Sequence, residues 1–155
     1  MKLDTRVFVN RPVGEVFARW ADLERAPEWA ATVIERRKLT EGPVGVGSKY
    51  RAVDQFPGRR IEFTLEITAY EPDRFMAGTW SGAVKGGWEA RFDERDGGTE
   101  LTVHAEMKPS GMLMLLSPLM GGVVFVRGVA VNNFERRAME KNLVRFKVWV
   151  EGGGS

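Results

Sequence analysis

Cysteine is absent from this chain of 155 residues, and histidine occurs once. Without cysteine the protein has no disulfide bond, no thiolate nucleophile and no thiolate ligand for a metal. The single histidine, His104, excludes a metal site built from several imidazoles, and no spacing of Asp or Glu indicates a carboxylate site. We therefore expect neither a metal nor another cofactor.

Long hydrophobic runs are also absent. No segment reaches the roughly 18 consecutive apolar residues of a membrane-spanning helix, and the most apolar segment, Gly121–Val131, contains Arg127. Residues 1–11 are charged and alternating, which is unlike a secretory signal. The sequence therefore predicts a cytoplasmic protein without integral membrane association.

Neither sign of charge dominates, because 23 Lys and Arg face 21 Asp and Glu, for a formal charge of +2. This balance does not favour nucleic acid as a partner, since proteins that bind it carry a clustered basic stripe. The length suits a single domain, which we place at residues 1–151. Residues 152–155, Gly-Gly-Gly-Ser, read as a flexible linker or tag remnant.

Alternation of apolar and polar residues marks most of the chain as strands. The cleanest segment, Arg60–Tyr70, puts Ile61, Phe63 and Leu65 on one face and polar residues on the other. One apolar face on each strand predicts a one-sided antiparallel sheet. The predicted strands are Lys2–Val9, Thr32–Leu39, Ser48–Gln55, Arg60–Tyr70, Arg74–Ser81, Trp88–Arg95 and Thr99–Lys108.

Spacings of three and four residues predict helices on both sides of this strand-rich region. The first helix follows Asn10, a candidate N-cap, with Pro12 at an early position. A second short helix covers about Leu23–Trp29, and one long helix runs from about Gly122 to Glu151. The predicted fold class is α+β: a curved seven-stranded antiparallel sheet around a long C-terminal helix, with two short helices after the first strand.

The faces predicted to point inward mix large side chains with small ones. Small residues on neighbouring strands leave volume between the sheet and the helix, and an apolar concavity with a few polar groups is typical of a small-molecule site. The alternative is that helix side chains such as Leu143 and Phe146 fill this volume. The small inward residues are Ala52, Ala77, Ala90 and Ala105.

Four features, in this order, resemble the START/Bet v 1-like (SRPBCC) superfamily. They are Trp29 after the short helices, the glycine-rich segment Leu39–Ser48, the corner Tyr70-Glu71-Pro72, and Gly97-Gly98-Thr99 before the last strand. Over Met1–Glu151 the chain looks most similar to the bacterial polyketide cyclase/dehydrase and lipid-transport branch. The resemblance implies a helix-grip fold whose large cavity holds a hydrophobic ligand such as a lipid, sterol, polyketide or aromatic compound. It implies no single activity, because such families include carriers, sensors and enzymes.

Two features depart from the pattern of this family. The start of the last helix, Val123–Val131, is unusually apolar, and Arg36 stands where an apolar strand residue is expected. Together with the Gly-Ser tail, they raise an engineered pocket as an alternative to a natural one.

Asp54 and Arg36 are the candidate catalytic residues. Asp54 shares strand parity with Tyr50, so we expect it to face inward, where a carboxylate in an apolar cavity could act as general acid or base. Arg36 is its expected partner, since buried charges need pairing; the alternative is that both groups are solvated at the rim. His104 shares the outward parity of Thr102, which indicates a surface histidine.

Three functions remain open. The first is binding of a small hydrophobic or aromatic ligand in the cavity. The second is a cyclase-, dehydratase- or isomerase-type enzyme, natural or engineered, in which Asp54 is the general acid or base and Arg36 or Tyr50 assists. The third is a protein-interaction module that uses the apolar stretch Met112–Val126. The expected ligand contacts are Tyr50, Ala52, Phe63, Leu65, Phe75, Ala77, Trp88, Ala90, Val103, Ala105, Asn132, Met139 and Leu143.

Overall fold

The computed structural model describes residues 2–153 apart from 110–120, with side chains described for residues 2–108 and 136–153. In these ranges the strands are β1 (Lys2–Val9), β2 (Val33–Lys38), β3 (Lys49–Phe56), β4 (Arg59–Glu71), β5 (Phe75–Gly82), β6 (Val84–Arg95) and β7 (Gly98–Pro109). The helices are α1 (Val13–Ala21), the 3-10 helix η1 (Leu23–Glu28) and α3 (Gly121–Glu151). None of the helices described is both long enough and apolar enough to span a membrane.

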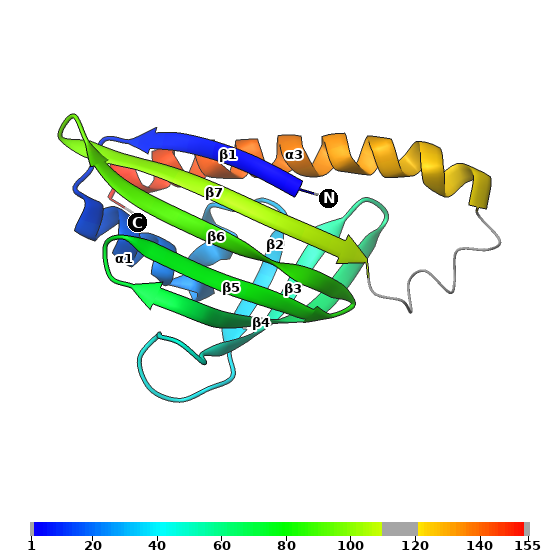
Figure 1. The fold of residues 1–155 in the computed structure, drawn as a ribbon, viewed down its shortest axis with the longest axis horizontal. Helices are drawn as coiled ribbons and strands as arrows, with labels where there is room; N and C mark the ends of the chain where they lie inside the picture. The colour runs from blue at the N-terminus through cyan, green and yellow to red at the C-terminus, as the bar shows by residue number, and fades with distance from the viewer. Residues whose placement is uncertain (1, 110–120, 154–155) are drawn as a thin grey trace.

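The strands form one antiparallel sheet in the order β1-β7-β6-β5-β4-β3-β2, so β1 and β2 are its edges. The sheet is curved, and the helices lie on its concave side (Figure 1). There α3 packs against β1, α1 against β6, and η1 against β2. The predicted α+β helix-grip fold is confirmed.

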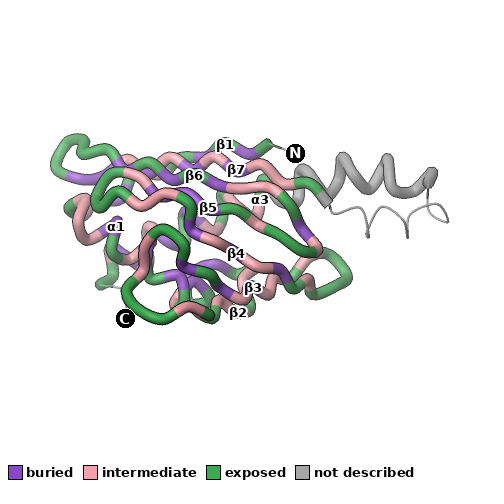
Figure 2. Tube along the Cα trace, turned by 60° about the horizontal axis from the view of Figure 1, so that its bottom comes forward, coloured by how far each residue is buried: buried purple, intermediate pink, exposed green. Residues whose placement is uncertain are grey.

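Burial along the strands follows the alternation of the sequence (Figure 2). In β4, Phe63, Leu65 and Ile67 are buried, and the residues between them are more exposed. Because successive side chains of a strand point to opposite faces, the apolar residues meet the helices on the concave face.

The facing predicted for Phe75 and Ala77 in β5 is wrong. Met76 pairs with Ala90, both are fully buried, and so Met76 faces the core. Neighbouring residues of a strand face opposite ways, so Phe75 and Ala77 belong to the convex face, where the guanidinium of Arg91 lies 5.1 Å from the centre of the Phe75 ring. Alternation is ambiguous here, because each face of β5 carries one aromatic residue and small residues.

Strand β6 begins at Val84, earlier than the predicted start at Trp88, and it includes glycines that resemble turn residues. Gly86 has a φ of 140°, and a Cβ there would lie 1.9 Å from the carbonyl oxygen of Glu106 on β7. Only glycine allows this close approach of the two strands, so its presence inside β6 has a steric cause.

The C-terminal end of α3 is tied to the loop between β1 and α1. Glu151 Oε1 accepts hydrogen bonds from Lys147 Nζ (2.5 Å) and from the amide of Asn10 (2.8 Å). Both bonds lower the pKa of Glu151, and the bond from Lys147 has the larger effect. Arg11 donates to the main-chain oxygen of Glu151. The prediction that Asn10 is the N-cap of α1 is wrong, because Pro12 takes that position, without a side-chain hydrogen bond. These bonds hold α3 in place over the sheet.

An aromatic cluster fills the interior between α1, η1 and the last turns of α3. The ring of Trp20 stacks on Trp29 at 5.5 Å and meets Phe146 edge-on at 5.4 Å. Phe17 packs edge-on against Phe92 at 5.1 Å. Phe146 therefore fills part of the interior, as expected under the alternative in which helix side chains occupy this volume. Open space remains only in the other part.

Candidate functional site: an apolar cavity with an ion pair in its wall

A cavity of about 190 Å³ lies between β2, the end of β3, β7 and α3. An engineered apolar cavity of about 150 Å³ binds benzene in another protein. The space is therefore large enough for a small apolar molecule.

The cavity brings together part of the predicted site. The predicted residues that line it are Arg36, Asp54, Val103, Met139 and Leu143. A second group is buried in the core without lining the cavity: Tyr50, Ala52, Phe63, Leu65, Trp88, Ala90 and Ala105. Phe75 and Ala77 lie on the other face of the sheet. The side chain of Asn132 and those of the stretch Met112–Val126 lie outside the described residues.

Other lining residues are not predicted by the sequence. Met107 shares strand parity with Val103, so alternation could have identified it, and Asn142 follows Met139 by three residues on the same helix. Residues of the short helices and turns carry no such signal, because their position depends on tertiary packing. The unpredicted lining residues are Leu3, Trp20, Trp29, Ala30, Thr32, Val33, Gln55, Phe56, Trp80, Met107, Ala138 and Asn142.

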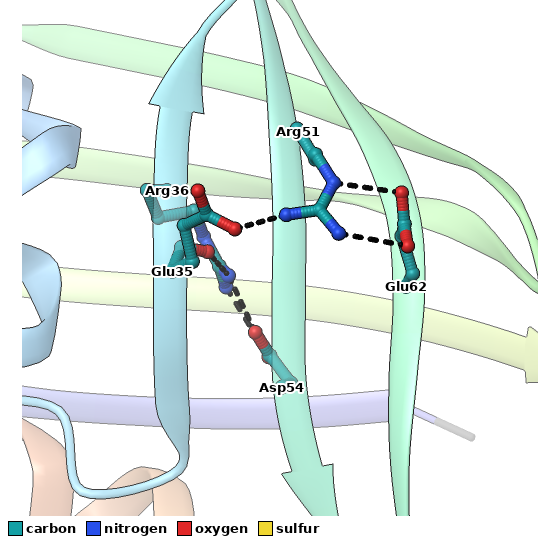
Figure 3. Close-up of polar contacts among 5 residues, drawn as sticks. All are labelled: Glu35, Arg36, Arg51, Asp54 and Glu62. Atoms are coloured by element: carbon teal, nitrogen blue, oxygen red, sulfur yellow. Dashed lines mark hydrogen bonds and ion pairs between the residues drawn. The ribbon is translucent and has the colours of Figure 1, made fainter.

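Arg36 and Asp54 form a two-bond ion pair in the cavity wall (Figure 3). Arg36 lies opposite Ala52 in the β2–β3 ladder, and Asp54 follows two residues later, so both share the concave face. Arg36 Nη1 donates to Asp54 Oδ1 and to the carbonyl oxygen of Glu35 (3.0 Å), while Nη2 donates to Asp54 Oδ2 (3.2 Å). The guanidinium also lies 5.5 Å from the centre of the Phe63 ring. With side chains only 9% and 17% exposed, the charges satisfy each other inside an otherwise apolar wall.

A second cluster holds the same edge of the sheet from the convex face (Figure 3). Arg51 on β3 donates to both carboxylate oxygens of Glu62 on β4, at 2.8 and 3.0 Å, and to Glu35 on β2. The hydrogen bonds from Arg51 lower the pKa of Glu62. The edge strand β2 is therefore linked to its neighbour on both faces.

Asn142 connects α3 to the turn before β2. Its Oδ1 accepts a hydrogen bond from the amide of Ala31 (3.0 Å), and its Nδ2 donates to Thr32 Oγ1 (2.9 Å). Asn142 and Thr32 both line the cavity, so this contact closes part of its boundary.

Tyr50, the predicted assistant of Asp54, lies in the core away from the cavity lining. It is 1% exposed, and its hydroxyl has no hydrogen-bond partner among the described residues. Burial, followed by the charges of Glu24 and Asp22, raises the pKa of Tyr50 to about 12. Its hydroxyl is therefore neutral at ordinary pH and is not placed to assist at the cavity.

His104 lies on the convex face, as its parity predicts. It faces Asp4 across the β1–β7 ladder, with Nδ1 2.5 Å from Asp4 Oδ1. Its side chain is 43% exposed. The prediction of a surface histidine is confirmed.

The chain is similar to a known family over almost its whole length. A family model described as "Polyketide cyclase / dehydrase and lipid transport" matches residues 1–151. No match was found among curated protein sequences.

Solved structures share the fold at low sequence identity. TTHA0849 from Thermus thermophilus superposes with a TM-score of 0.81 at 15% identity, and 100% of each chain is covered. The Zhui aromatase/cyclase from Streptomyces sp. R1128 gives a TM-score of 0.73 at 19% identity, covering 97% of this chain and 93% of the other. Ara h 8.0201 gives 0.67 at 14% identity, with 97% of each chain covered. At these identities the likeness concerns the fold, and it agrees with the resemblance seen in the sequence.

Proposed function

Because the chain belongs to the polyketide cyclase/dehydrase and lipid-transport family, we propose that it binds a small hydrophobic or aromatic molecule in the cavity between the sheet and α3. The observation that carries this proposal is the 190 Å³ of space beside an otherwise well-filled core. Atoms that line an empty apolar cavity lose dispersion contacts on one side, and an apolar guest restores them. Three tryptophans in the lining, Trp20, Trp29 and Trp80, supply large apolar surface for such a guest.

The ion pair gives this apolar space a polar point. A guanidinium has five N–H groups, and the described partners of Arg36 use three of them. The remaining donors suit an oxygen atom of a ligand, while the paired charges avoid the cost of an isolated buried ion. A mainly apolar molecule that carries an oxygen atom on the part lying in the cavity fits this wall best.

Tryptophan fluorescence tests the proposal directly, because three tryptophans line the cavity. We expect titration with 1-octanol or toluene to give a saturable change in the wild type. Val103→Phe should abolish it, since the larger ring extends from β7 into the cavity, whereas Val103→Ala should retain it. Circular dichroism establishes that both variants are folded. A response that does not saturate, or that is the same in the wild type and Val103→Phe, would contradict ligand binding in this cavity.

An acid–base enzyme is the second candidate, favoured by the position of Asp54 in the cavity wall. Asp54 accepts two hydrogen bonds from Arg36, yet each carboxylate oxygen has a further lone pair for a substrate proton. Asp54→Asn separates the two functions, because it removes the base and keeps the shape of the side chain. Octanol binding should persist in this variant under either function, whereas turnover of a cyclisable or dehydratable substrate should be lost only if Asp54 is catalytic.

A further inference from the structure

A surface groove beside the cavity is lined by a row of cationic side chains on α3. Arg137, Lys141 and Arg145 are each four residues apart, so they lie on one side of the helix. All three are exposed, and none forms a salt bridge with a carboxylate in the part of the chain whose side chains are described. Among the described residues Glu140 is the one carboxylate in the groove lining, so positive charge is in excess there.

The groove and the cavity share part of their walls. Thr32, Ala138 and Asn142 line both. The hydrogen bond from Asn142 to Thr32 closes one part of this common wall. Ala138, about one helical turn before Asn142, also belongs to this common wall. Ala138 lines both spaces with only a methyl group, so the cavity and the row of cations are neighbours across a small side chain.

We propose that the ligand is an amphipathic anion, with its apolar part in the cavity and a carboxylate or phosphate head group on Arg137, Lys141 and Arg145. This inference rests on the proposed function, since it requires the apolar part to occupy the cavity. Inside the cavity the charge of Arg36 is balanced by Asp54. The row on α3 is therefore the net positive charge next to the cavity, and it suits an anionic group that stays in contact with water.

Octanoate and 1-octanol are suitable probes, because they share an alkyl chain and differ in charge at pH 7. We compare the wild type with R137Q/K141Q/R145Q and with a control of equal charge change, R74Q/K85Q/R91Q, whose three cations are exposed on or next to β5 and β6. Glutamine has nearly the helix propensity of Arg and Lys, so α3 is preserved. We expect the α3 variant to bind octanoate about tenfold more weakly, as three exposed ionic contacts of ordinary strength would imply. Octanol binding should stay the same in all three proteins.

Salt provides a second readout. Raising the ionic strength from 0.1 to 1 M shortens the screening length from about 10 Å to about 3 Å. It should weaken octanoate binding to the wild type and leave octanol binding unaffected.

The outcomes separate this inference from the function on which it rests. If octanol does not bind, or if Val103→Phe does not abolish its binding, the proposed function fails, and the inference fails with it. If octanol binds but the α3 variant keeps full affinity for octanoate, the inference alone is overturned. If the charge-neutral double variant R36M/D54L loses affinity for octanoate while the α3 variant does not, the head group lies inside the cavity, which also overturns the inference.

Discussion

Removing Arg36 alone should destabilise the protein far more than removing Arg36 and Asp54 together. Arg36→Met leaves the carboxylate of Asp54 in a wall where the ion pair supplies its hydrogen bonds. A buried charge without its partner loses solvation and gains nothing in return. In R36M/D54L no charge remains, and apolar side chains of similar size replace both partners.

The magnitude follows from the burial of the pair. Breaking a buried ion pair by removing one partner costs about 3–5 kcal/mol. Asp54 is 17% exposed, so some water reaches it, and we expect the lower end, about 3 kcal/mol. For a chain of this size each kcal/mol lowers Tm by about 2–4 °C, hence a loss of about 6–12 °C for Arg36→Met. The double variant should lie within about 1 kcal/mol of the wild type or above it.

Urea unfolding of the wild type, both single variants and the double variant gives the full thermodynamic cycle. Arg51→Met is the matched control. Arg51 on β3 also pairs with carboxylates of neighbouring strands, Glu35 on β2 and Glu62 on β4, but it lies on the convex face with a side chain 34% exposed. It should cost less than Arg36→Met. Equal losses for the two Arg variants, or a double variant as unstable as the sum of its singles, would refute a desolvated pair in the cavity wall.

Three further changes test other parts of the fold. Tyr50→Phe removes a buried hydroxyl without a described partner and should raise the free energy of unfolding by about 1 kcal/mol. Because burial raises the pKa of Tyr50 from 10.0 to about 12, the wild type should lose about 1.4 kcal/mol more stability per pH unit than the variant as the pH rises between these values. The pKa of Glu151 is lowered in the folded state. Its contribution to stability is therefore present at a pH above the ordinary pKa of a glutamate and is lost as the pH falls through the lowered pKa. Glu151→Gln should flatten the acid side of a Tm–pH curve. Gly86→Ala should cost at least about 3 kcal/mol in urea unfolding because its Cβ would meet the Glu106 carbonyl oxygen, and Gly58→Ala, where nothing lies within 4 Å, should cost less.

Most of the fold can be predicted from the sequence because its strands are half-buried. A strand with one solvent-exposed face shows period-two alternation. The bounds of β1 and β4 therefore agree with the predicted bounds to within one residue. The pattern fails where a local steric demand interrupts it. In β6 the close approach at Gly86 requires glycine, which reads as a turn, so the strand begins earlier than predicted.

The candidate site is less predictable, because it depends on which volume the helices leave empty. Parity places Asp54 inward and makes Arg36 its partner, and the two side chains do form an ion pair; their catalytic role stays a prediction. Parity cannot reveal that Trp20, Trp29 and Phe146 pack together and fill part of the interior. Ala90 belongs to this packed core and Ala52 to a smaller cluster with Phe63 and Val84, so neither alanine lines the cavity.

The stability of the fold does not explain why the cavity wall contains the Arg36–Asp54 ion pair. Apolar residues of similar volume would hold a buried wall about as well as a paired Arg and Asp, or better. Arg51 with its two carboxylates already links β2 to β3 from the convex face, so the fold does not depend on a second charged clamp inside. Apolar residues could not supply a hydrogen-bond donor in the cavity wall, which Arg36 lines. This supports the proposal that Arg36 and Asp54 recognise a polar group on a mainly apolar ligand.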